Sequence, residues 1–374
     1  MAFDRDEYAG RVDRTRASMA AANVDLLIVD EGELLCYLTG FDISDTRYRA
    51  CLIPARGDPV MIVRHLDVGL FQSQAWFDEC VGFRDWDDPF AALVTAVDDR
   101  GWPRRRVGLD FNSYCMTAHR FGRLTETLRG ADFVDMSTEL ARLRWRKSAS
   151  EIALLRQAAG IADASMAAVI EAAEPGVRER DVAAATSANF VRLGADHGRT
   201  GPMRVSSGWD FLHANISDRA LTAGDILHVE LVPMVRGYSA RLMRPIMIGA
   251  VPSDHARSAA QIIDIQDRQI AAMDPGTPAR EVDRLCRQGM LEAGLRQDYH
   301  NVTGYALGYY SRTGPRASNF DQAFMPSADW LLEEGMVFHM YTSAAGLAFS
   351  ETVLVTDTGP ERLTRTDRSI LEGP

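Results

Sequence analysis

The second half of the chain passes twice through the same order of elements, two helices followed by strands. Helical patterns cover residues 143–173, 177–193, 253–273 and 279–294, and strand patterns cover residues 203–208, 225–233, 237–249, 335–342 and 347–356. Helices grouped before strand pairs are typical of an α+β fold, and the repetition indicates an internal duplication. The order of elements therefore predicts one α+β domain, which we place at residues 143–374.

The first half follows a different pattern, in which helices and strands alternate. Helices are predicted at residues 5–22, 88–100 and 117–129, and strands at 25–30, 33–40, 51–54, 59–64, 106–110 and 131–136. Such alternation predicts an α/β domain, which we place at residues 1–142. No glycine-rich phosphate loop follows any of these strands, so the pattern does not favour a nucleotide site.

Composition excludes several classes of function. Of the 374 residues, 46% are hydrophobic and 25% charged, as in a folded globular protein, and the formal charge of −11 argues against binding to nucleic acid or an anionic membrane. The five cysteines are scattered without a C-x-x-C pair, which favours reduced thiols. We find neither an apolar leader nor a long apolar stretch, so we expect a cytoplasmic protein.

One predicted hairpin, residues 224–244, carries two charges where burial is expected. Glu230 lies in the apolar first strand, and Arg241 follows on the return strand after a turn at Arg236-Gly237-Tyr238. A carboxylate in a buried strand needs a partner or a chemical task. The pattern leaves three interpretations open: an ion pair with Arg241, a remnant of a metal site, or a catalytic acid or base.

The second half resembles the pita-bread superfamily of aminopeptidase P, prolidase and creatinase. The stretches that carry the resemblance are LRWRKSASEIALLRQAAGIAD, SSGWDFLHA, LTAGDILHVELVPMVRGYSARLMRPIMIG, TGYALG, LEEGMVFHMYT and SETVLVT, with YLTGF in the first half. The resemblance implies an α+β pita-bread catalytic domain behind a creatinase-like α/β N-terminal domain.

The metallopeptidases of this superfamily bind two divalent ions through two Asp, one His and two Glu. By resemblance, this chain has Glu230 and Arg241 for the two Asp, Tyr305 for the His, and Tyr341 and Glu351 for the two Glu. A permanent cation at Arg241 opposes a dication. We therefore expect neither a metal nor another cofactor.

Two metal-free branches of the superfamily, creatinase and ectoine hydrolase, show a similar loss of ligands. Glu230, TGYALG, GMVFHMYT and Ser350-Glu351-Thr352 fit the ectoine hydrolase pattern, whereas DISDTRYRA and YYSRTGPRASNF depart from it. The resemblance implies a metal-independent hydrolase of a non-peptide C–N bond in a small zwitterion, such as a cyclic amidine or guanidino acid. A metal-dependent Xaa-Pro-type peptidase and a non-catalytic binding protein on the same fold are the alternatives.

The resemblance also implies roles for individual residues. Glu230 attacks the carbon or activates water, His213 passes a proton to the leaving nitrogen, Tyr305 or Tyr341 stabilises an oxyanion, and Glu351 positions a cationic nitrogen. Substrate contacts are expected from Arg241, His228, His339 and Trp209. Each has a plainer alternative: His213 as a structural histidine, the tyrosines and Trp209 as packed rings, and Glu230 as half of an ion pair.

Creatinase also contributes an arginine from its N-terminal domain to the site of the neighbouring subunit. By that resemblance, Arg47 or Arg49 binds the substrate carboxylate of a partner, and the protein is a homodimer. Arginines in an exposed loop are otherwise simply solvated.

Overall fold

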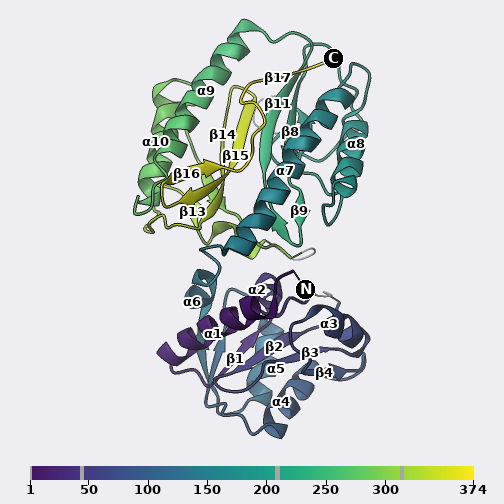
Figure 1. The fold of residues 1–374 in the computed structure, drawn as a ribbon, viewed down its shortest axis with the longest axis vertical. Coiled ribbons are helices and arrows are strands. Elements are labelled where there is room, and N and C mark those ends of the chain that lie inside the picture. Colours follow the sequence, from purple (N-terminus) through teal and green to yellow (C-terminus); the bar gives the residue numbers. More distant parts are fainter. Residues whose placement is uncertain (1, 43–45, 207–210, 312–315) are drawn as a thin grey trace. The chain divides into compact units, whose positions relative to one another are not determined.

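The computed structural model describes residues 2–42, 46–206, 211–311 and 316–374, and its chain divides into two compact units (Figure 1). The first unit comprises Met1–Arg144 with Tyr309–Ser318, and the second comprises Trp145–Gly308 with Asn319–Pro374. The sequence pattern placed the boundary after residue 142 and gave no sign that a short segment of the second half belongs to the first unit.

The first unit is built on a six-stranded sheet in the order β4-β3-β2-β1-β5-β6. Its strands are β1 (Leu26–Val29), β2 (Ala50–Pro54), β3 (Val60–Arg64), β4 (Cys80–Phe83), β5 (Arg106–Leu109) and β6 (Asp132–Asp135). Its helices are α1 (Arg5–Ala21), α2 (Gly32–Thr39), α3 (Val68–Gln74), α4 (Pro89–Asp99), α5 (Ala118–Thr127) and α6 (Ser137–Arg142), with a 3-10 turn η1 (His65–Asp67). β1 pairs in parallel with β5 and antiparallel with β2, so the sheet is mixed.

Residues 33–40, predicted as a strand, instead form helix α2. The Glu31 side chain accepts a hydrogen bond from the backbone N–H of Leu34 at its start, and Gly40 ends it with a left-handed φ of 75°. All eight residues of the helix are buried. A short apolar run that is buried on every side lacks the period that distinguishes a helix from a strand, which explains the error.

The second unit contains a nine-stranded sheet whose main path runs β13-β12-β14-β15-β11-β8-β7. These strands are β7 (Met203–Val205), β8 (Ile226–Leu231), β11 (Leu242–Ile248), β12 (Gly304–Ala306), β13 (Ala323–Phe324), β14 (Val337–Ala344) and β15 (Leu347–Thr356). β16 (Gly359–Arg362) pairs with β15, and β17 (Leu371–Gly373) pairs with β11. A 3-10 turn η2 (Ala317–Phe320) precedes β13.

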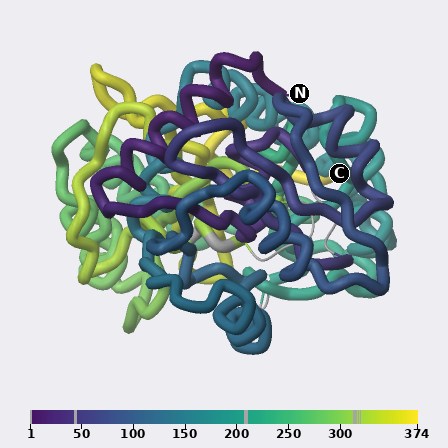
Figure 2. Tube along the Cα trace, turned by 90° about the horizontal axis from the view of Figure 1, so that it is seen from below, coloured from purple at the N-terminus to yellow at the C-terminus, as the bar shows by residue number. Residues whose placement is uncertain are grey.

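Two helix pairs belong to this unit, α7 (Ala149–Ala172) with α8 (Glu179–Arg192) and α9 (Ser253–Ala271) with α10 (Ala279–Glu292). The members of each pair lie side by side in both views (Figures 1 and 2). Helices α9 and α10 pack on the face of β14 and β15 that carries Phe338, Met340 and Phe349. The opposite face of the same strands is thereby left for other side chains.

The predicted reversal in the hairpin is confirmed. Strands β9 (Met234–Val235) and β10 (Tyr238–Ser239) pair across a turn in which Arg236 and Gly237 have φ of 49° and 83°. Two positive φ angles match the right-handed twist of a two-residue hairpin, and glycine adopts one of them without strain. The Asp196 carboxylate accepts both backbone N–H groups of the turn, at 2.8 and 2.7 Å.

Helix α7 is the one described helix long and apolar enough to cross a membrane by length and composition. Half of its most apolar window is buried inside the protein, as in the core helix of a soluble protein. Its start is set by a capping box between Ser148 and Glu151.

Candidate active site

Four side chains form a row across the face of the second unit's sheet that lies opposite α9 and α10. Glu230 on β8 is opposite Met243 on β11, Met243 is opposite Ser350 on β15, and Ser350 is opposite Tyr341 on β14. Residues directly opposite on neighbouring strands point to the same face. The register therefore brings together Glu230 and Tyr341, which lie 111 positions apart in the sequence.

A second row lies beside the first and contains Tyr305, His339 and Thr352, on β12, β14 and β15. The Thr352 hydroxyl accepts a hydrogen bond from the backbone N–H of Arg241 at 2.8 Å and donates to its carbonyl at 2.9 Å. These two bonds fix the backbone of Arg241 between β10 and β11. The Arg241 side chain is thus anchored next to both rows.

Arg241 and Glu230 form a buried ion pair. Nη1 of Arg241 donates to Oε1 of Glu230 at 2.8 Å, and the two residues are 5% and 4% exposed. The guanidinium carbon also lies 5.6 Å from the centre of the Tyr305 ring. The charge of the carboxylate in these rows is therefore balanced by a cation that cannot be deprotonated.

Two buried histidines share this face and remain neutral. Burial, assisted by the positive charge of Arg241, holds the pKa of His339 well below its usual value, and its ring contacts those of Tyr305 and Tyr341 at 5.0 and 5.2 Å between centres. Burial lowers the pKa of His228 to about 3. His228 contacts the Phe211 ring instead, at 4.9 Å, so of the two predicted contacts His339 is the one that lies with the tyrosines.

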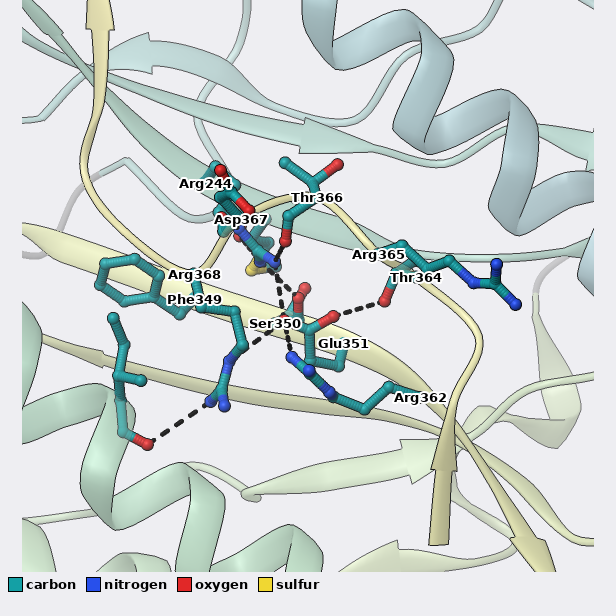
Figure 3. Close-up of polar contacts among 12 residues, drawn as sticks. Arg244, Phe349, Ser350, Glu351, Arg362, Thr364, Arg365, Thr366, Asp367 and Arg368 are labelled. Carbon is teal, nitrogen blue, oxygen red and sulfur yellow. Dashed lines mark hydrogen bonds and ion pairs between the residues drawn. The ribbon is translucent and has the colours of Figure 1, made fainter.

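Glu351 is not part of this group, and its predicted role is corrected. It lies opposite Met340, on the face that α9 and α10 cover. Its carboxylate accepts hydrogen bonds from Arg244 (2.7 Å) and from the Thr364 hydroxyl, with Arg368 at 3.3 Å (Figure 3). Burial raises the pKa of Glu351, while Arg244 and Thr364 oppose that rise.

Arg244 makes this cluster a structural clamp. Besides Glu351, its guanidinium donates to the backbone carbonyls of Met243, Ser350, Thr366 and Asp367, at 2.7 to 2.9 Å. It thus ties strands β11 and β15 to the segment after β16. Arg244 therefore also orients the buried carboxylate of Glu351, through one charge-assisted hydrogen bond.

The remaining predicted residues lie elsewhere. His213 is an exposed residue in the loop after residue 210, and no hydrogen bond or ion pair within the described ranges joins it to Glu230. Trp209 lies outside the described residues. Arg49 is buried inside the first unit with Nη1 3.2 Å from the Cys115 sulfur, a position that does not favour contact with a partner. Arg47 is half-buried and donates to the Asp87 carbonyl at 3.4 Å.

Three residues of the site were missed by sequence reasoning: Ser350, Thr352 and Asn301. The signal for the first two was available, because a period of two along β15 puts Ser350 and Thr352 on one face and Glu351 on the other. Asn301 lies in the loop before β12 and donates to the Tyr341 hydroxyl at 3.2 Å. A single asparagine next to a strand carries no such signal.

The residues of this face do not fit a dinuclear metal centre. Such a centre needs several oxygen ligands around each ion, and the two rows contain one carboxylate, which is held by a guanidinium. Within the described parts of the chain, no group of three or more His, Cys, Asp or Glu is placed to hold a metal ion.

Comparison with known proteins gives the family. The model of metallopeptidase family M24 matches residues 153–357, and that of the creatinase/prolidase N-terminal domain matches residues 11–145. The chain belongs to family M24. This is a family of hydrolases, and the predicted pita-bread domain behind a creatinase-like N-terminal domain is confirmed.

The family's named relatives differ in substrate. The chain is similar to the ectoine hydrolase of Halomonas elongata, with 25% identity over 96% of each chain. It is also similar to the "Probable dipeptidase PepE" of Mycobacterium tuberculosis, with 31% identity over 96% of this chain and 94% of the relative. The crystal structure of dipeptidase PepE from Mycobacterium ulcerans matches with a TM-score of 0.83 and 25% identity, covering 100% of this chain and 99% of the other. Relatives named as an ectoine hydrolase and as dipeptidases thus both match the chain over nearly its full length.

Proposed function

We propose that this chain hydrolyses a non-peptide C–N bond in a small zwitterionic molecule without a bound metal ion. The observation that carries the proposal is the buried pair of Glu230 and Arg241, joined at 2.8 Å. A guanidinium supplies the fixed positive charge that a divalent ion would otherwise bring to this carboxylate. The chemistry must then be carried by side chains and water.

In the proposed reaction, Glu230 attacks the electrophilic carbon or activates a water molecule that does so. If Glu230 acts as the base, it takes a proton from water as the hydroxyl bonds to the carbon; if it attacks, water displaces it from the carbon in a second step and Glu230 leaves as a carboxylate. In both cases the C–N bond breaks with its electron pair on nitrogen, the nitrogen takes a proton from His213, and the proton that water loses restores His213. Arg241 binds the carboxylate of the substrate, and a tyrosine hydroxyl donates to the atom on which negative charge develops. Glu351 has no part in this scheme.

A cyclic amidine or a guanidino acid is the proposed substrate class. The similarity to ectoine hydrolase over nearly the full length of both chains supports it. A zwitterion also suits the rows of side chains, in which one anion and one cation are accompanied by neutral His339 and neutral hydroxyl groups.

A metal-dependent dipeptidase is the second candidate, favoured by the 31% identity to PepE. In that case a metal ion would have to bind beside Arg241, against the repulsion between two cations at short range.

One experiment separates the two candidates. Purified protein is first analysed for Mn, Zn, Fe and Co. It is then incubated with ectoine, hydroxyectoine, creatine and Xaa-Pro dipeptides, with and without a chelator, and the masses of the products are measured. We expect a product from a non-peptide substrate, an unchanged rate with chelator, and metal well below one ion per chain. Hydrolysis of dipeptides alone, and only with added metal, would reject the proposal.

A further inference from the structure

The amide of Asn301 has a polarity that its neighbours fix. Its Oδ1 accepts a hydrogen bond from Nη1 of Arg296 at 3.2 Å, and its Nδ2 donates to the Val302 carbonyl at 3.0 Å. Arginine can only donate and a carbonyl can only accept, so the amide cannot be turned over without losing both bonds. Nδ2 must therefore face Tyr341, whose hydroxyl oxygen lies 3.2 Å away.

This polarity determines the direction of the Tyr341 hydroxyl. Because Nδ2 has no lone pair to offer, Tyr341 accepts from Asn301 and cannot donate to it. Within the described residues Asn301 is the hydrogen-bond partner of the Tyr341 hydroxyl, and it only donates to it. The hydroxyl proton of Tyr341 is therefore available to a ligand. Burial raises the pKa of Tyr341 and the charge of Glu230 adds to the rise, although the bond from Asn301 opposes it, so the hydroxyl keeps its proton at neutral pH.

Asn301 is itself held on its other side. Its backbone carbonyl accepts from Arg287 at 3.1 Å, and the Asp283 carboxylate binds the Arg287 guanidinium through two bonds of 2.7 and 2.8 Å. Asp283 also accepts from the Thr303 hydroxyl at 2.9 Å. Helix α10, which carries Asp283 and Arg287, thus fixes the position of the loop from which Asn301 contacts Tyr341.

We propose that Asn301 is a positioning residue that orients Tyr341 as the hydrogen-bond donor to the reacting group of the substrate. The inference rests on the proposed function and goes beyond it by selecting Tyr341 over Tyr305 as the donor. Removal of one such donor from a transition state typically lowers kcat by about 10²- to 10³-fold.

The test is the isosteric change Asn301→Asp. A carboxylate only accepts, so Tyr341 would turn its proton toward residue 301 and away from the substrate. With the non-peptide substrate identified in the screen, we expect Asn301→Asp and Tyr341→Phe each to lower kcat about 100-fold at a similar KM, and the double variant to lose little more. Asn189→Asp is the matched control: Asn189 donates to Ser165 on α7, so its change should leave kcat unaltered.

A second measurement needs no substrate. In protein labelled with 13C at tyrosine Cζ, the Tyr341 signal is the one lost in Tyr341→Phe, and its titration gives the ionisation midpoint. We expect a higher midpoint in Asn301→Asp than in the wild type, because a donor to the phenolate is replaced by a negative charge. An unchanged midpoint, or an unchanged kcat, overturns the inference. If the wild type turns over no non-peptide substrate, the proposed function fails, and the titration alone decides on Asn301.

Discussion

Replacing Glu230 with glutamine separates the structural and catalytic interpretations of the buried pair. The change keeps the size of the side chain and an oxygen that accepts from Nη1 of Arg241, but it removes the negative charge. Both residues are at most 5% exposed, so the Arg241 cation stays in a buried position without its counter-charge. Breaking a buried pair in this way costs about 3–5 kcal/mol of unfolding free energy, and because one hydrogen bond is retained we expect Glu230→Gln to cost about 3 kcal/mol.

This cost converts into a measurable change in melting temperature. For a unit of about 200 residues, 1 kcal/mol corresponds to roughly 2–4 °C, so the second unit should melt about 6–12 °C lower. Replacing both charges, in Glu230→Leu with Arg241→Met, should recover most of the loss, because a pair of apolar residues of similar volume leaves no buried ion. Differential scanning calorimetry on the wild type, on Glu230→Leu and Arg241→Met separately, and on the double variant gives the coupling energy between the two side chains.

Kinetics on the same proteins complete the test, at a temperature where every variant is folded. We expect turnover by Glu230→Gln to fall by several orders of magnitude while substrate binding persists. A melting temperature within about 2 °C of the wild type would refute the energetic reasoning on the pair. Near-normal turnover would remove Glu230 from the mechanism and leave the ion pair as its whole role.

Three further predictions concern other parts of the chain. Glu351→Gln should destabilise the second unit by about 3 kcal/mol, because buried Arg244 loses its counter-charge, yet leave kcat of the folded protein unchanged, as measured by calorimetry and steady-state kinetics. In the first unit, burial raises the pKa of Asp30 to about 6. Between about pH 4 and pH 6 the Asp30 carboxyl is ionised in the unfolded chain but still protonated in the folded one. The free energy of unfolding should therefore fall by about 3 kcal/mol as the pH rises through this range. Urea unfolding measures the fall, and Asp30→Asn should not show it. Finally, we expect a homodimer in which the loop 42–49, with Arg47, faces the partner's second unit; a fully active monomer in light scattering would contradict a shared site.

Much of the fold was predictable because it depends on periodicity and turn chemistry. The four long helices of the second unit and the turn at Arg236-Gly237 follow from patterns within a few residues of each other. Helix α2 was not predictable in this way, because a fully buried segment has no exposed face to mark its period.

The site was only partly predictable, and its errors have physical causes. Glu230, Arg241, Tyr305 and Tyr341 come together as expected, because the strands fix their faces. Glu351 was assigned to the wrong face, since a shift of one residue along a strand reverses the direction of the side chain. Asn301 depends on Arg287 of α10 and on Arg296 of its own loop, contacts that no helix or strand period encodes.

The Arg244 clamp has a consequence for how the protein is made in the cell. Glu351 and Arg244 are fully buried, but their charges are satisfied only with help from Thr364, Thr366 and Asp367, and β17 pairs with β11 still later in the sequence. While a ribosome has yet to release this stretch, the central strands of the second unit carry ions that lack their acceptors. Its sheet can therefore close only after residues 364–373 have left the ribosome, and truncation after residue 362 should yield a chain that chaperones and proteases recognise as incomplete.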